Sequence, residues 1–219
     1  MGRLPDLERR TELLDGVVGY LAEHGLADVS LRPMAAALGV SVNGLIHHFG
    51  PKDDIVVAAL RRANDVQTEV LERWLARNPN LSQADVLRRW WRWINSSPGN
   101  LAIVRLGIEA AALEATSSGL PGVVRSEQIG LWRTNVEQRL IAEGIPLEHA
   151  RVEASLVKAM FTGLVIDLLA TGERRRLSRA LELALSRLEQ MVWARAGLSD
   201  PAIPAATRIR ASPSGEASR

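Results

Sequence analysis

The chain has 219 residues, enough to bury a sizeable core in one large domain or in one small domain plus a larger one, and its formal net charge is +2. It contains no cysteine, which excludes disulfides, thiolate metal sites and a cysteine nucleophile. The amino terminus carries no apolar segment of signal-peptide length, and no window reads as apolar enough to span a bilayer. We therefore expect a cytoplasmic protein with no membrane partner.

Four helices are predicted between residues 7 and about 76. The first spans 7–24, where apolar residues follow an i, i+3, i+4, i+7 spacing that Gly25 ends. Ser30 opens a helix over 31–38, because its hydroxyl can accept from the unpaired N–H groups of a first turn. Gly39 ends that helix, since glycine adopts the left-handed conformation without a clash, and the next begins at Ser41. Pro51 opens the fourth and longest helix.

The two short helices and their tight turn predict a helix-turn-helix. In that arrangement one helix lies on a DNA backbone while the next enters the major groove. Neither helix is long enough to be stable alone, so both must pack through apolar faces. The residues that supply those faces are Met34, Leu38, Val40, Leu45 and Phe49.

Five further helices are predicted, at residues 82–96, 100–116, 121–143, 147–170 and 175–196. No stretch alternates with period two for long enough to predict a sheet, so the predicted fold class is all-α with about nine helices. Residues 198–219 are too rich in Pro, Ser and Ala to pack, and we interpret them as a disordered tail.

The segment around the turn carries an ordered motif. It reads Gly39-Val40-Ser41-x-x-x-Leu45-x-His47-His48-Phe49-x-x-Lys52, preceded by Ala22-Glu23-His24-Gly25 and Ser30-Leu31-Arg32. Over roughly residues 7–62 this pattern resembles the DNA-binding domain of the tetracycline-repressor (TetR) family. A looser similarity, to the dimerising end of that family, follows in Phe161-Thr162-Gly163-Leu164 and in Asp167-Leu168-Leu169-Ala170-Thr171-Gly172.

The resemblance implies a DNA-binding transcriptional regulator, a homodimer that binds a roughly palindromic operator and is released from it by a small-molecule effector. Residues 1–62 would then be the DNA-binding domain, with a bridging helix that continues to about 76. Residues 63–197 would form the effector-binding and dimerisation domain. The expected partners are double-stranded operator DNA, a second copy of the chain and the effector, with no cofactor.

Nine residues match the positions through which the family contacts DNA. Ser30, Arg32 and Lys52 match backbone contacts, and the residues on the recognition helix are Ser41, Val42, Asn43, Gly44, His47 and His48. Asn43 is the residue suited to bidentate recognition of adenine, and Val42 can touch a thymine methyl group. The chain departs from the family at Ile46, where a phosphate-binding tyrosine is frequent.

The charge of this segment supports an alternative function. Residues 1–62 carry seven Lys and Arg against eight Asp and Glu, a formal charge of −1, which is unfavourable for phosphate binding. The alternative is a helical ligand-binding or enzymatic protein whose helix-turn-helix is vestigial. We expect no enzyme and no metal site, because the segment 39–43 misses a nucleophile elbow by one residue and the adjacent His47 and His48 point about 100° apart.

The effector site is predicted between residues 82 and 172, with Arg105, Glu109, Trp132 and Asp167 as candidate contacts. Asp167 lies in an apolar run, so it needs a partner, which can be an arginine, the second protomer or a ligand. The tryptophans at 90, 91 and 93 favour core packing over a ligand box, because adjacent helical positions face different ways.

The dimer is predicted on the last two helices, where two apolar stripes would form a four-helix bundle with their copies. The residues of these stripes are Val157, Met160, Phe161, Leu164 and Leu168, followed by Leu181, Leu185 and Leu188.

Overall fold

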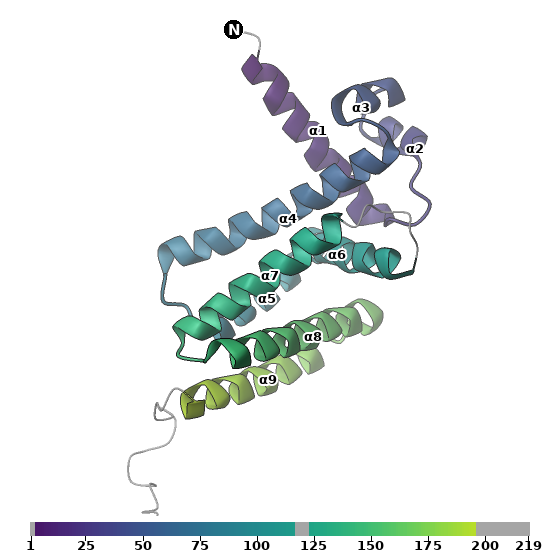
Figure 1. Cartoon of the computed structure of the whole chain (residues 1–219). Helices are drawn as coiled ribbons and strands as arrows, with labels where there is room; N and C mark the ends of the chain where they lie inside the picture. The colour runs from purple at the N-terminus through teal and green to yellow at the C-terminus, as the bar shows by residue number, and fades with distance from the viewer. Residues whose placement is uncertain (1–2, 117–122, 196–219) are drawn as a thin grey trace, which may run out of the picture.

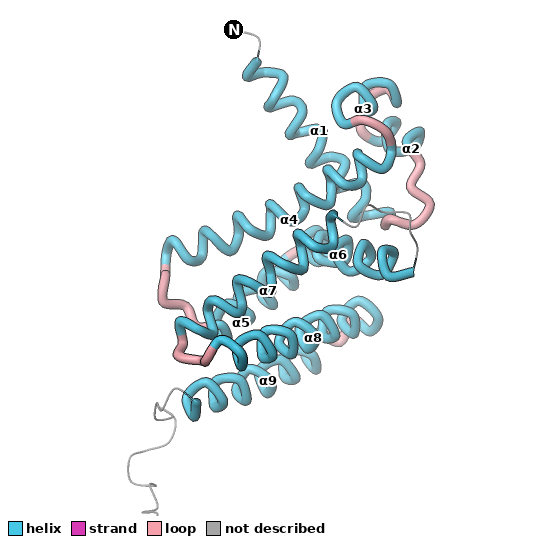
Figure 2. The backbone as a smooth tube through the Cα atoms, viewed as in Figure 1, coloured by secondary structure: helices cyan, strands magenta, loops and turns pink. Residues whose placement is uncertain are grey.

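The computed structural model describes residues 3–116 and 123–195, and every element in these two ranges is an α-helix (Figures 1 and 2). The helices are α1 (Arg3–His24), α2 (Leu31–Ala37), α3 (Val42–Phe49), α4 (Lys52–Arg77), α5 (Gln83–Ser96), α6 (Pro98–Thr116), α7 (Val123–Ala142), α8 (Leu147–Thr171) and α9 (Arg174–Arg195). The predicted all-α class is confirmed for this part of the chain. The predicted helix start at residue 121 and the tail at 198–219 lie outside the described residues.

One core cluster joins α1, α2, α3 and the first half of α4. Each of these helices contributes a side chain that is 0% exposed: Leu21, Met34, Leu45 and Ile55. The seven-residue α2 and the eight-residue α3 depend on this burial, because helices so short are not stable alone. The same cluster includes Leu106 and Ala110 of α6, so a helix from beyond residue 62 completes the amino-terminal core.

A second core cluster is built from the end of α4 together with α5, α7, α8 and α9. Gly144 (φ 92°) ends the turn after α7, and Gly172 (φ 68°) turns α8 into α9. The three helices therefore run as consecutive antiparallel neighbours (Figure 1). The predicted domain boundary at residue 62 falls inside α4, which continues unbroken through both clusters.

α8 departs from the expectation that no segment is apolar enough to cross a bilayer. By length and composition alone it could do so, with a mean hydropathy of 1.6. Helices that are apolar on all sides also occur in the cores of soluble proteins. Here α8 packs between α7 and α9, which accounts for one of its apolar sides.

Leu106 tests whether α6 belongs to the amino-terminal core. Leu106→Ala should lower the free energy of unfolding by about 2–5 kcal/mol, because the buried side chain leaves a cavity behind. Ile141→Ala on α7, where the side chain is 40% exposed, is the matched control and should cost less than about 1 kcal/mol. Urea unfolding at one fixed protein concentration measures both. Equal losses in the two variants would contradict the packing of α6.

Candidate DNA interface and effector cavity

The turn between α2 and α3 depends on Gly39 and Ser41. Gly39 has φ 66°, and its N–H donates to the carbonyl of Ala36 at 3.2 Å. Ser41 then caps α3, because its Oγ accepts from the N–H of Gly44 at 3.0 Å. α2 ends at Ala37, one residue earlier than predicted. The arrangement is a helix-turn-helix with a left-handed glycine at the turn.

Ser30 stands at the N-cap of α2, but its side chain makes no capping hydrogen bond, contrary to the prediction. An N-cap side chain usually accepts from the N–H of the second or third residue of the helix. The third residue of α2 is Pro33, which has no N–H to donate. The exposed Ser30 hydroxyl therefore keeps its capacity to donate and accept.

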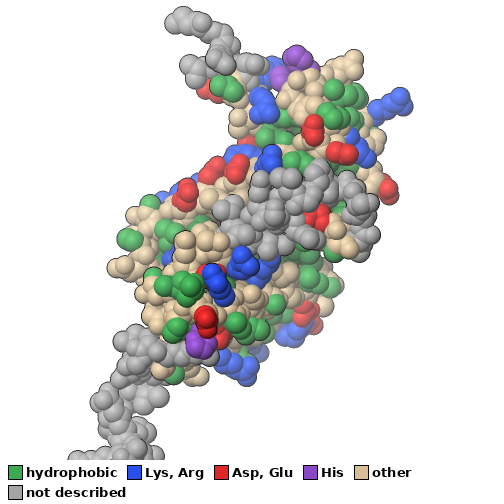
Figure 3. All heavy atoms as spheres, in the orientation of Figure 1, with side chains coloured by type: hydrophobic (Ala, Val, Ile, Leu, Met, Phe, Trp, Pro, Cys, Tyr) green, Lys and Arg blue, Asp and Glu red, His purple; other side chains and the backbone are tan. Residues whose placement is uncertain are grey.

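α3 turns a polar side outward while its apolar side enters the core. Leu45 (0% exposed) and Phe49 (8%) anchor the helix. The predicted DNA contacts divide by exposure into Arg32, Ser41, Asn43, His47 and Lys52, which are exposed, and Val42, Gly44 and His48, which are half-buried. Histidine side chains gather at the tip of the molecule that α3 forms (Figure 3). A helix with this free side can enter a major groove.

A cationic residue beside α3 is absent from the predicted set. Arg10 of α1 donates through Nε to the carbonyl of His48 at 3.3 Å, and its guanidinium carbon lies 4.9 Å from the ring centroid of Phe49. Arg10 thus adds positive charge at the carboxyl end of α3. The contact joins residues 38 positions apart, so no local sequence pattern could have shown it.

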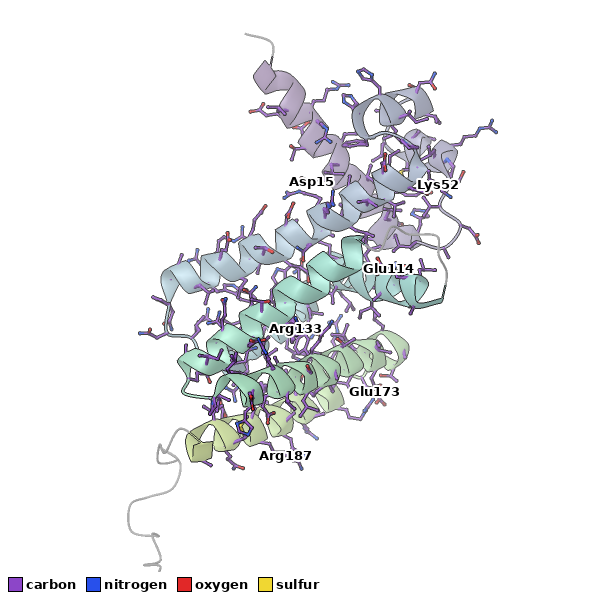
Figure 4. All side chains as sticks on the ribbon, in the orientation of Figure 1. Asp15, Lys52, Glu114, Arg133, Glu173 and Arg187 are labelled. Atoms are coloured by element: carbon purple, nitrogen blue, oxygen red, sulfur yellow. The ribbon has the colours of Figure 1, made fainter. Side chains whose placement is uncertain are left out.

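The acidic residues of the segment 1–62 lie outside α3, which contains no Asp or Glu. Asp15 of α1 pairs with Arg62 of α4 at 2.7 Å, and Arg62 also pairs with Glu69 at 2.8 Å. These two carboxylates hold the pKa of Arg62 well above its ordinary value. Figure 4 shows Asp15 beside the middle of α4, whereas Lys52 lies at the start of α4 next to the short helices.

A cavity of about 250 Å³ lies among α4, α5, α6, α7 and α8. Trp132, a predicted effector contact, lines it together with Trp90 and Phe161. Trp91 instead packs inside the core, where its Nε1 donates to the Ser178 hydroxyl at 2.8 Å. Trp90 does both, since it is 8% exposed in the core cluster and also faces the cavity.

Arg105 and Glu109, two of the predicted effector contacts, do not line this cavity. The Arg105 guanidinium donates to the carbonyl of Ala22 at 2.7 Å, and Glu109 accepts from the N–H of Leu26 at 2.9 Å. The two side chains also pair with each other at 3.0 Å. They thus bind the carboxyl end of α1, where helical backbone groups lack partners of their own.

Asp167, another predicted effector contact, does not line this cavity either. It lies on the surface at the end of α8, and both of its oxygens accept from Arg176 Nη2, at 2.8 and 3.0 Å. This arginine lowers the pKa of Asp167, and the Thr171 hydroxyl adds a weaker bond. Of the three partners considered for this carboxylate, the structure provides the arginine.

The apolar stripes predicted to meet a second protomer lie in the core of the protomer itself. Val157, Phe161, Leu168, Leu181, Leu185 and Leu188 are all 9% exposed or less. Met160 and Leu164 are partly buried against the same cluster. Because α8 packs on α7 and α9 while α9 packs on α5 and α8, these stripes are used within the protomer, and a partner would have to meet another face.

Together the fold and the outward side of α3 define a helix-turn-helix DNA-binding protein with a helical carboxy-terminal part. Residues 13–59 match the family described as bacterial regulatory proteins, tetR family. The HTH-type transcriptional repressor KstR2 of Rhodococcus jostii is 43% identical over 53 residues, which are 24% of this chain and 26% of that protein. Residues 13–59 therefore form a DNA-binding domain of the tetR type, and the chain is a DNA-binding transcription regulator.

Solved structures extend the likeness over the whole fold. A transcriptional regulator from Rhodococcus sp. Rha1 aligns with a TM-score of 0.70 at 24% identity, over 87% of this chain and 99% of that one. The multidrug binding protein EbrR, in a complex with imidazole, aligns with a TM-score of 0.60 at 27% identity, over 93% and 96%. These likenesses do not favour the alternative of a vestigial helix-turn-helix.

The two serines that precede α2 and α3 provide a matched test of the turn. Ser41→Ala removes the bond to the Gly44 N–H and should lower the free energy of unfolding by about 0.5–2 kcal/mol. Ser30→Ala removes no capping bond and should change it by less than about 0.5 kcal/mol. Urea unfolding of the two variants side by side measures the difference, and an equal loss in both would refute it.

Proposed function

We propose that the protein is a cytoplasmic homodimeric repressor, without enzymatic activity, that binds a roughly palindromic operator and leaves it when a small molecule fills the cavity. The observation that carries this proposal is the exposed polar side of α3. The opposite, apolar side anchors the helix in the core, and cations of α1 and α4 flank it. Its polar groups match those that proteins use to read base edges and bind phosphates.

The proposed DNA contacts divide by chemistry. Asn43 is exposed on the first turn of α3 and can pair with both the N6 and N7 of an adenine. Arg10, Arg32 and Lys52 are exposed cations around α3, and we assign them to phosphates. Base reading and backbone binding thereby fall on different side chains, which separates their effects in a binding measurement.

Asn43→Ala should relax sequence discrimination at one or two base pairs, costing about 1–3 kcal/mol on the preferred operator. Arg10→Gln should instead weaken binding about equally on all sequences and reduce the slope of log affinity against log salt by about 1. A mobility-shift titration with DNA flanking the gene, and with single-base variants of the protected site, distinguishes the two patterns. No binding of the wild-type protein to any such DNA, or unchanged preference in the Asn43→Ala variant, would refute the proposed interface.

The proposed dimer uses the exposed side of α8. Along this helix a second set of apolar and small residues recurs every three or four positions, and all of them are exposed in the protomer: Val152, Leu156, Ala159, Gly163, Ile166 and Ala170. A spacing of 3.5 residues suits the close approach of another helix. Leu156 and Val152 are 58% and 60% exposed, too much apolar surface to leave in water on neighbouring turns. A second α8 related by a two-fold axis would cover them.

Leu156→Glu tests this interface. A charge within this interface would be buried without a partner, so the variant should sediment as a monomer. It should also bind operator much more weakly, since one recognition helix contacts only one half-site. Ile141→Glu, at an exposed apolar position of α7, is the control and should stay dimeric. Sedimentation showing an intact dimer for the Leu156→Glu variant would contradict the assignment.

Release from DNA requires that the effector binds one conformation more tightly than the other. α6 is suited to transmit that preference, because Val104 and Ile108 face the cavity while Arg105 and Glu109 on the adjacent side bind α1. A ligand that displaces α6 would move α1, and with it the helix-turn-helix. The structural neighbour described as a multidrug binding protein supports a small-molecule site in this domain.

A further inference from the structure

The cavity is lined by apolar and aromatic side chains and by two basic ones. Trp90 of α5 and Trp132 of α7 offer ring surfaces, and Ile108 of α6 adds an aliphatic wall. Lys158 of α8 and Arg139 of α7 also line the cavity. Among the residues that line it there is no Asp or Glu. The cavity therefore combines apolar surface with positive charge.

Of the two cations, Arg139 is already engaged by the protein. It donates to the carbonyl of Leu81 at 3.2 Å, and the carboxylate of Glu143 lies close enough to oppose the effect of burial on its pKa. Its guanidinium therefore has protein partners whether or not a ligand is present.

Lys158 has a different environment. Burial lowers its pKa, and the positive charge of the neighbouring Arg133 of α7 lowers it further. Figure 4 shows Arg133 between α7 and α8. No carboxylate of the described residues forms a salt bridge with Lys158. A half-buried ammonium with a cationic neighbour and no anion is held at a cost in free energy, and an anion in the cavity would remove that cost.

We propose that the cavity binds a small monocarboxylate with an apolar or aromatic body, whose carboxylate pairs with Lys158 and whose body lies against Trp90 and Trp132. Thr162 lies one turn after Lys158 on α8 and also lines the cavity, so its hydroxyl can donate to the same carboxylate. A cationic ligand would meet two positive side chains and no counter-charge. This assignment deepens the proposed function, since it rests on the same cavity being the effector site.

The volume limits the size of the ligand. An apolar protein cavity of about 150 Å³ accommodates benzene, which has six carbon atoms, or about 25 Å³ for each non-hydrogen atom. By that ratio the cavity of about 250 Å³ holds on the order of ten such atoms. Phenylalkanoic acids with a short chain have this size and carry one negative charge at neutral pH.

Calorimetric titration of the full-length protein with three probes tests the charge preference. The probes are 3-phenylpropanoate, its neutral amide 3-phenylpropanamide and the cation 3-phenylpropylammonium, which share nearly the same body. The acid should bind at least about tenfold more tightly than the amide, and the ammonium should bind more weakly than the amide. Lys158→Met should remove the advantage of the acid over the amide while leaving the affinity for the amide within about threefold.

Arg187→Met on the surface of α9 is the matched control, because it removes a cation that lies away from the cavity, and it should change none of the affinities (Figure 4). Amide or ammonium binding as tight as that of the acid would overturn the proposal. So would an unchanged acid preference in the Lys158→Met variant, or no binding of any probe to the folded protein. A mobility-shift assay with operator DNA on the same preparation distinguishes the effector role of the cavity from its preference for a monocarboxylate. Binding of the acid without release of the operator would contradict the effector role but not the ligand class.

Discussion

The contact between α6 and the carboxyl end of α1 joins the two parts of the molecule. It combines burial of Leu106 and Ala110 in the amino-terminal core with two side-chain hydrogen bonds. Arg105 donates to the carbonyl of Ala22 in α1, and Glu109 accepts from the N–H of Leu26 just after that helix. The carbonyl of Ala22 and the N–H of Leu26 lie where a helix ends, so without these bonds they would have to be satisfied by water. The neighbouring side of α6 forms part of the cavity wall. One rigid helix therefore lies between the cavity and the helix-turn-helix.

α4 provides a second, covalent connection. It begins one residue after Pro51, just past the recognition helix, and continues for 26 residues into the carboxy-terminal core. Asn64 and Gln67, in its middle, line the cavity, while Ile55 and Leu60 nearer its start belong to the amino-terminal core. A change at the cavity that tilts α4 or α6 thus acts on α3 through elements that cannot bend independently of their cores.

The sequence was sufficient to predict the order of the helices and most of their ends to within two residues, because these depend on local chemistry. The largest difference is at α1, which begins at Arg3, four residues before its predicted start. Gly39 and Ser41 make the turn as expected, and Ser82 caps α5 by accepting from the Asp85 N–H at 3.1 Å. Ser30 shows the limit of that reasoning, since a residue with the right side chain makes no cap when the third helical residue is proline.

The faces of the carboxy-terminal helices could not be predicted in the same way. α8 carries two apolar stripes, so periodicity identifies both and does not tell which one meets the core. The pairing of Asp167 with Arg176 and of Arg10 with α3 depends on how helices pack, which a single sequence does not specify. The same holds for Lys158, whose position in the cavity becomes visible only when α7 and α8 are placed side by side.

The role of the contact between α6 and α1 is tested most directly by the operator affinity of a Glu109→Ala variant, compared with that of the wild type. Asp15→Asn is the control, because it breaks a surface ion pair of α1 that does not involve α6. If the contact between α6 and α1 positions the helix-turn-helix, Glu109→Ala should weaken operator binding about tenfold, equivalent to about 1.4 kcal/mol, in a protein that remains folded and dimeric. Asp15→Asn should bind within about threefold of wild type. Wild-type operator affinity in a folded Glu109→Ala dimer would contradict the account.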